Sequence, residues 1–168
     1  MTPDLTNLYN QAETACVNTI QNDAWLGDAD HVAKVHEKLR INNDWSYKYL
    51  AHQTPAIGCY CPGSVGGQEP AGGGRTLRLR MVFNIVVYGG DVNAADEKCK
   101  EIGARLQHLI SIQRLTARYP EAATLLDGFI AQGEIALDDQ MIFSVSAGAK
   151  KGWIAEGATA ATISLYLD

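Results

Sequence analysis

The stretch that decides the fold is LRLRMVFNIVVY, residues 77–88. It contains two interleaved series, Leu77, Leu79, Met81, Phe83, Ile85 and Val87 against Arg78, Arg80, Val82, Asn84, Val86 and Tyr88. A strict period of two is typical of a β-strand, and the all-apolar first series predicts one fully buried face. The second series is basic at its start and apolar at its end. We therefore expect a strand that runs from an exposed region into the centre of a sheet and ends at Gly89-Gly90.

A helix with one buried face is predicted near the start of the sequence, from Pro3 to Gln21. Its apolar positions recur at intervals of three and four residues, which is the spacing of one helix face. These positions are Leu5, Leu8, Tyr9, Ala12, Ala15, Cys16, Thr19 and Ile20. Thr2 is a suitable N-cap, and Pro3 is a suitable first helical residue.

A second helix is predicted soon after the long strand, from Asn93 to Ile110. Asn93 is the expected N-cap, and Asp96 is the expected first-turn carboxylate. The apolar stripe of this helix is Ala95, Cys99, Ile102, Leu106, Leu109 and Ile110. Gly103 falls within the helix, and we expect the backbone to pack closely on the sheet there.

Shorter strands complete the predicted sheet. One covers Pro55 to Cys61, and two more cover residues 135–137 and 141–145, on either side of Asp138-Asp139. The last strand alternates from Thr159 to Leu167. Such a strand pairs either within its own sheet or with the sheet of a neighbouring molecule.

Other stretches do not read as strand. Cys61 to Arg75 is predicted to be a flexible loop, because glycine at its density costs too much chain entropy for a regular element. Its glycines and prolines are Pro62, Gly63, Gly66, Gly67, Pro70, Gly72, Gly73 and Gly74. The segment from Trp25 to Gln53 is weakly patterned, apart from a short helix that Asp44 is expected to cap. A helical turn is predicted at Pro120 to Leu126.

The order of these elements predicts one α+β domain over residues 1–168, with a mixed, mainly antiparallel sheet packed by an N-terminal helix and a central helix. The net charge of −5 argues against general binding to nucleic-acid backbones. The chain opens without a secretory signal pattern, and no apolar run approaches the roughly 18 residues of a membrane span. We therefore expect synthesis in the cytosol, no membrane contact and four reduced cysteines.

The closely spaced thiols Cys59 and Cys61 raise the question of a metal site. A structural zinc site takes four ligands, commonly as two close pairs, and the spacing of His31, His36 and His52 matches no known finger. Packed thiols are the favoured interpretation, with metal binding as the alternative. Cys16 and Cys99 lie on the apolar faces of the predicted helices, where cysteine behaves as a small hydrophobe.

No stretch matches a catalytic motif, so we expect neither an enzyme nor a cofactor. Gly74-Arg75-Thr76 leads into a strand and lacks the lysine and the helix of a phosphate-binding loop. Ser64 lacks the G-x-S-x-G pattern that exposes a nucleophile. The pairs Asp28 with Asp30 and Asp138 with Asp139 lie beside turn signals, where aspartate bonds to the local backbone.

Several residues are candidates for contact with a partner. Arg75, Arg78 and Arg80 lie where the predicted loop meets the long strand, and they are either solvated or in ionic contact with an acidic surface. Trp25, Trp45 and Trp153 either pack internally or anchor an interface. The candidate interface residues are Arg75, Arg78, Arg80, Gly66, Gly67, Gly73, Trp153 and Tyr166.

The element order resembles that of a known family. An amphipathic N-terminal helix leads to a short strand with Pro55-Ala56-Ile57 and then to a long loop. A long strand from Arg75 to Tyr88 follows, then Gly89-Gly90-Asp91, a helix and closing hairpin strands. This order is similar to that of tail terminator and tail-completion proteins of long-tailed phages and related contractile particles.

The resemblance implies a virion assembly protein at the head–tail junction, made in the host cytoplasm. It implies a six-membered ring that caps the tail tube, stops its growth and joins the head connector, and that contacts sheath in a contractile particle. DNA would pass through the ring, and an acidic pore wall would prevent it from sticking. The alternatives are a head–tail connector or neck subunit, and a small metal- or ligand-binding protein.

Overall fold

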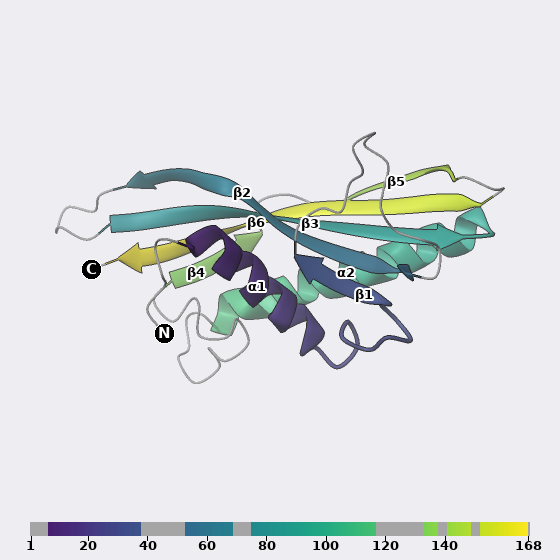
Figure 1. The fold of residues 1–168 in the computed structure, drawn as a ribbon, viewed down its shortest axis with the longest axis horizontal. Coiled ribbons are helices and arrows are strands. Elements are labelled where there is room, and N and C mark those ends of the chain that lie inside the picture. Colours follow the sequence, from purple (N-terminus) through teal and green to yellow (C-terminus); the bar gives the residue numbers. More distant parts are fainter. Residues whose placement is uncertain are drawn as a thin grey trace.

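A computed structural model describes residues 7–37, 53–68, 75–116, 133–137, 141–148 and 152–167. Within these ranges the chain forms two helices and six strands (Figure 1). In chain order they are α1 (Leu8–Gln21), β1 (Lys34–Glu37), β2 (Ala56–Gln68), β3 (Arg75–Gly89), α2 (Val92–Thr116), β4 (Gly133–Leu137), β5 (Ile142–Ala147) and β6 (Trp153–Leu167). The expected α+β class is confirmed.

The strands form one mixed sheet in the order β1-β2-β3-β6-β4, with β5 also paired to β6. The β1–β2 pair is parallel, and the four other pairs are antiparallel. β4 and β5 share one side of β6, β4 beside its C-terminal half and β5 beside its N-terminal half. The prediction of a mixed, mainly antiparallel sheet is therefore confirmed.

Strands β3 and β6 form the spine of this sheet. They pair over their whole length, from Arg75 opposite Leu167 to Gly89 opposite Trp153. The predicted buried face of β3 is confirmed: Leu79, Met81, Phe83, Ile85 and Val87 are buried, and Leu77 is partly buried. The C-terminal strand is thus paired on both sides within its own sheet, which answers the question that its sequence left open.

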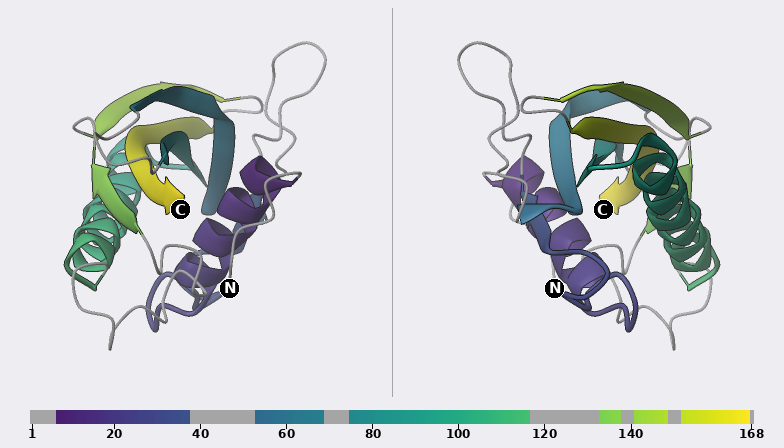
Figure 2. Two further views of the ribbon diagram at one scale, coloured as in Figure 1. Left: turned by 90° about the vertical axis from the view of Figure 1, so that its left-hand side faces the viewer. Right: turned by 90° about the vertical axis from the view of Figure 1, so that its right-hand side faces the viewer.

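Both helices pack against the buried face of β3 and join one apolar core. α1 lies against β1 and β2, whereas α2 lies against β6, β3 and β4. Figure 2 shows the two helices splayed apart beneath an arched sheet. The apolar stripe predicted for α2 is buried at every position, and so is that of α1 between Leu8 and Ile20, except for Tyr9. Tyr9 lies on this side of α1 by its spacing but is 46% exposed, so the prediction that it is buried was wrong.

The helix starts differ from those predicted. α1 begins at Leu8 after Asn7, and the expected cap and first residue, Thr2 and Pro3, lie outside the described residues. α2 begins at Val92, because the Asp91 carboxylate accepts a hydrogen bond from the Ala94 backbone N–H at 2.8 Å. The prediction of Asn93 as N-cap was therefore wrong.

The long loop predicted for Cys61–Arg75 was also wrong in its first half, because β2 continues to Gln68. Pairing with β3 sustains the strand through two register shifts, between Tyr60 and Gly63 and between Ser64 and Gly67. β1 pairs only as far as Cys59, so Pro62 lies on a free edge, where its missing N–H is tolerated. Gly66 and Gly67 are therefore strand residues. Residues 69–74, which include Gly73, lie outside the described ranges.

Gly103 confirms the predicted close packing of α2. A Cβ at this position would lie 2.8 Å from Cζ of Phe143, which comes from β5. Glycine thus lets the aromatic ring of the edge strand pack directly on the helix backbone. The helix predicted after Asp44 and the turn at Pro120–Leu126 lie outside the described residues.

Candidate interaction surfaces

Two of the three candidate arginines lie on the outer face of the sheet, which the helices do not cover. Arg78 and Arg80 are both exposed on β3, opposite Ser164 and Thr162 of β6. Arg75 is the first residue of β3, and its side chain is outside the described set. Two guanidinium groups in register on one rigid strand can bind carboxylates of an acidic partner.

The residues predicted as one interface lie at two ends of the sheet. Gly67 pairs with Leu77, and Tyr166 with Thr76, so both lie at the basic end. Trp153 pairs with Gly89 at the other end of β3. At about 3.3 Å per residue, the eleven steps from Arg78 to Gly89 span roughly 36 Å. The candidate interface residues therefore belong to two separate surfaces.

The second surface surrounds β5, which within the described part of the chain pairs with β6 alone and has no strand at its other edge. Ile142 is 71% exposed, and Val145 and Trp153 are each 37% exposed. By strand alternation, Ile142 points to the outer face and Val145 to the helix side, so apolar groups flank the edge on both faces. The strand IFSVSA carries no charge. We call β5 together with Trp153 the β5 edge.

The edges of β1 and β2 are guarded in ways that the β5 edge is not, and the edge strand β4 contains Glu134. The free edge of β2 carries Pro62 and two register shifts. The edge strand β1 carries Lys34 and Glu37, and its Val35 carbonyl accepts a hydrogen bond from the Gln21 side chain at 3.3 Å. Proline, bulges and charges are common devices against unwanted strand pairing. β5 has an unbroken register and none of these devices within its six residues.

A third surface is the outward face of α1. Its exposed residues, which we call the α1 face, are Asn7, Asn10, Thr14 and Gln21. Tyr9 is also exposed, but it lies on the side of the helix that carries the buried Cys16 and Ile20. The only charged residue of this helix is Glu13, which is 3% exposed and accepts a hydrogen bond from the Cys61 backbone N–H at 2.9 Å. The α1 face is therefore uncharged, although the Glu37 carboxylate borders it and accepts a bond from Thr14.

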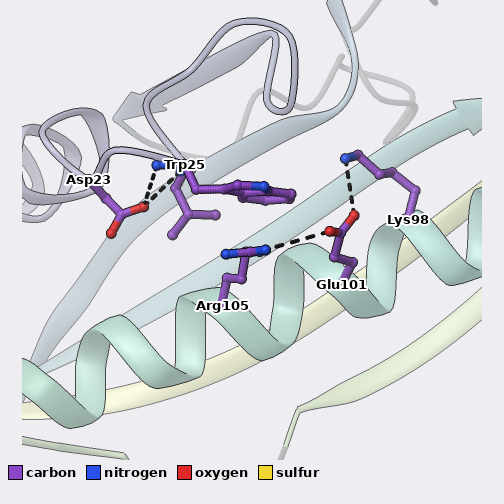
Figure 3. A network of polar contacts seen from close by, with 6 residues as sticks. Asp23, Trp25, Lys98, Glu101 and Arg105 are labelled. Carbon is purple, nitrogen blue, oxygen red and sulfur yellow. Dashed lines mark hydrogen bonds and ion pairs between the residues drawn. The ribbon is translucent and has the colours of Figure 1, made fainter.

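The outward face of α2 is, by contrast, rich in charge that the molecule itself uses (Figure 3). Lys98 and Arg105 both pair with Glu101, and their cationic groups lie 4.6 and 4.0 Å from the ring centroid of Trp25. Trp25 also stacks on His31, with ring centroids 4.3 Å apart. These contacts hold the loop after α1 on α2, so Trp25 is a packing residue and not an interface anchor.

The four cysteines are free and buried, as expected for packed thiols. Burial raises the pKa of Cys16 and of Cys99 to about 12, and it also raises the pKa of Cys59 and Cys61. Thiols with raised pKa values stay protonated at neutral pH, and a protonated thiol is a poor nucleophile and metal ligand. Among the described residues, no group of three or more His, Cys, Asp or Glu side chains is arranged to hold a metal ion.

The remaining chemical candidates have structural roles where they are described. The Asp28 carboxylate accepts a hydrogen bond from the Asp30 backbone N–H at 3.0 Å, as expected of a turn residue. Asp138, Asp139 and His52 lie outside the described ranges. An apolar pocket of about 10 Å³ lies between the helices and Phe83, with room for about one water molecule.

The sequence reading missed Tyr9, Ile142 and Val145 as surface residues. The signal that points to them is the lack of charge, in the whole exposed face of α1 and in the strand IFSVSA. Apart from the buried Glu13, α1 has no charged residue, and the edge strand IFSVSA has none.

Comparison with known proteins adds no relative: no protein-family model and no curated protein matches the chain. Among the helices in the described residues, none is both long and apolar enough to cross a membrane.

Proposed function

We propose that this chain is a structural assembly protein that acts as a tail terminator, capping a tail tube as a ring and joining it to a head connector. A subunit of such a ring must contact its own copies, the tube and the connector at the same time. It therefore needs several contact surfaces held at fixed positions on one rigid scaffold.

The observation that carries the proposal is the arrangement of surfaces along the β3–β6 spine. The basic pair Arg78 and Arg80 lies at one end, and the apolar β5 edge with Trp153 lies at the other. The fifteen-residue pairing of β3 with β6 fixes the separation between them. The element order on which the resemblance to tail terminators rests is changed in the structure by the added strand β1 and by the continuation of β2 to Gln68.

In this proposal the basic pair contacts an acidic rim of the tube or the connector. Two exposed arginines at fixed register favour encounter with a negatively charged surface, and their contribution falls as the salt concentration rises. The apolar β5 edge suits a more permanent contact, because it removes apolar surface and free backbone groups from water.

Light scattering of the purified chain, alone and with tube subunits, tests the proposal. We expect a discrete oligomer, alone or on tubes, and tubes that stop growing when it is added. The double variant Arg78→Glu, Arg80→Glu should bind tubes or connectors at least about tenfold more weakly, because two attractive charges become repulsive. The matched control is Lys100→Glu, an exposed lysine on α2, which should bind normally.

A chain that stays monomeric and never binds tubes would count decisively against tube capping. Binding to portal-side proteins without tube binding would instead identify a head–tail connector or neck subunit. Normal binding by the double arginine variant would remove the basic pair from the interface.

A further inference from the structure

Three of the four large apolar side chains that are exposed among the described residues lie on the β5 edge. They are Ile142, Val145 and Trp153, and the fourth, Tyr9, lies on α1. Single exposed hydrophobes are normal. At the β5 edge, however, they flank backbone N–H and C=O groups that no described strand pairs, and both kinds of group are stabilised by contact with a further strand.

The β5 edge is also a place where two copies of the chain can meet without electrostatic repulsion. Each copy has a net charge of −5, so two copies repel one another as whole molecules. β5 has no charged residue, and the one charge in the part of β6 that pairs with it is Glu156, opposite Ser144. If two β5 edges pair, the two Glu156 residues are three strand spacings apart, about 14 Å, which exceeds the Debye length of about 8 Å at physiological ionic strength.

The sequence of β5 is complementary to a second copy of itself. With Ser144 of the two copies opposite each other in an antiparallel pair, Phe143 of each copy lies opposite Val145 of the other. On the outer face, Ile142 lies opposite Ser146 of the other copy. Paired residues then share a face, as a continuous sheet requires. Aromatic side chains opposite β-branched ones are favourable cross-strand pairs, and this register forms two of them.

We infer that the free chain forms a twofold dimer in which two β5 edges pair antiparallel about Ser144. Each edge then supplies the donors and acceptors that the other lacks. Because both copies use the same patch, the contact closes on itself and gives a dimer and nothing larger. The inference goes beyond the proposed function, since it concerns the chain before it meets a tube, and the proposed ring uses further surfaces.

Cysteine cross-linking tests both the contact and its register. Directly opposite residues of an antiparallel pair have Cα atoms about 4.5–5.5 Å apart, which is within the range that a disulfide bridges. Ser144→Cys changes an exposed position and should give a covalent dimer when diamide takes up the two thiol hydrogens. The native cysteines are buried, so the unaltered chain should not be cross-linked.

Ser146→Cys is the matched control, because it changes the same residue type on the same strand and face. In the inferred register, the Ser146 residues of the two copies are four steps apart along the strand, about 13 Å. That distance exceeds the reach of a disulfide, so this variant should give little covalent dimer. Equal cross-linking of both variants would indicate random collision and would overturn the inference, and so would a lack of cross-linking at Ser144.

A charge at the same position tests the contact without oxidation. Ser144→Lys sets two ammonium groups opposite each other, and sedimentation velocity should show dimerisation weakened at least about tenfold. A one-to-one mixture of Ser144→Lys with Ser144→Glu should dimerise more tightly than either variant alone, because opposite charges then face each other. The control Ala104→Lys adds a charge to the outward face of α2 and should dimerise like the unaltered chain.

An unaltered chain that stays monomeric would overturn the inference, and so would a mixture that dimerises no more tightly than its components. Protection of β5 amides that appears only when tube subunits are added would identify a strand of the tube as the occupant and would also overturn it. A dimer linked through Ser144→Cys that ignores tubes would refute only the capping function. Tube capping by a chain that cannot be cross-linked at this position would refute only the pairing.

Discussion

The two helices cover the same face of one sheet, yet their solvent-facing sides differ in charge. The outward face of α2 carries Lys98, Lys100, Glu101 and Arg105, which pair with one another or with neighbouring groups of the same helix and loop. The outward face of α1 carries no charge at all. Since burial of the inward faces is similar, the difference between the helices lies in whether charged side chains are paired on the solvent-facing side.

The free edges of the sheet repeat this contrast. The second half of β2 is guarded by Pro62 and two register shifts, and β5 is unguarded. Protection against strand pairing is a general need of edge strands, so its absence at one edge is informative. The β5 edge is therefore the surface that we propose contacts a neighbouring molecule.

The largest expected effect on stability comes from Phe83, a β3 residue that lines the pocket between the two helices. Phe83 is 2% exposed and lines the apolar pocket with Cys16 and Ile20 of α1 and with Leu109 of α2. Phe83→Asp places an unpaired carboxylate there and should cost at least about 4 kcal/mol, enough to prevent folding. Circular dichroism during urea titration should show no cooperative transition, whereas Phe83→Leu should unfold cooperatively at a lower midpoint. Cooperative unfolding of Phe83→Asp would contradict the position of the core.

A smaller loss of stability is expected from a change at Trp25, which packs against two charged side chains of α2. Trp25→Ala removes the ring that stacks on His31 and lies over Arg105 and Lys98. The free energy of unfolding should fall by about 2 kcal/mol, because Trp25 also packs against the core. Trp25→Phe should recover part of it. Assembly should be unchanged at temperatures where the variant is folded, and a selective loss of assembly would place Trp25 in the interface after all.

The buried thiols on the two helices should lower the free energy of unfolding to a similar extent at alkaline pH. Burial raises the pKa of Cys16 on α1 and of Cys99 on α2 to about 12, whereas an unfolded thiol ionises near pH 8.5. Between these values the folded chain keeps protons that the unfolded chain releases, so a rise in pH favours unfolding. The free energy of unfolding should fall above about pH 8.5, by up to about 1.4 kcal/mol per pH unit for each thiol.

Urea titrations between pH 7.5 and 10 measure this slope. Cys16→Ala and Cys99→Ala should each remove a similar share of it, because each removes one thiol. A slope that is unchanged in both variants would show that the thiols are not protected by folding.

The smallest expected effect on stability comes from matched surface changes. Ser144→Lys on β5 and Ala104→Lys on α2 each add one charge at an exposed position. Each should change the free energy of unfolding by no more than about 0.5 kcal/mol. Only Ser144→Lys should weaken dimerisation, as measured by sedimentation. Equal weakening by both variants would remove the distinction between the β5 edge and the outward face of α2.

The framework of the fold could be predicted because it depends on local periodicity. The alternation in 77–88 and the stripes of both helices report which side chains are buried, and those patterns persist in the structure. The extension of β2 beyond Cys61 could not be predicted in this way. Its glycines and Pro62 are poor strand residues, and pairing with β3, a contact distant in sequence, holds them in place.

The candidate surfaces were harder to predict, because exposure depends on the whole fold. Arg78 and Arg80 were identified from the polar face of one strand, and both are exposed. Trp153 was grouped with them, since sequence does not reveal that it lies at the far end of the spine. Tyr9 fits the apolar stripe of α1 by spacing, yet it is 46% exposed in the first turn of the helix, because spacing does not reveal where along a helix burial begins.

Amide hydrogen exchange gives the most direct test of the proposal that the β5 edge contacts a neighbouring molecule. Peptides that cover Ile142–Ala147 should exchange more slowly in the assembled protein than in the dilute single copy, because a neighbour bonds the free edge of β5. The guarded edge of β2, residues 61–68, should exchange at the same rate in both samples. Unchanged exchange in β5 on assembly, or slowing confined to other strands, would contradict the account.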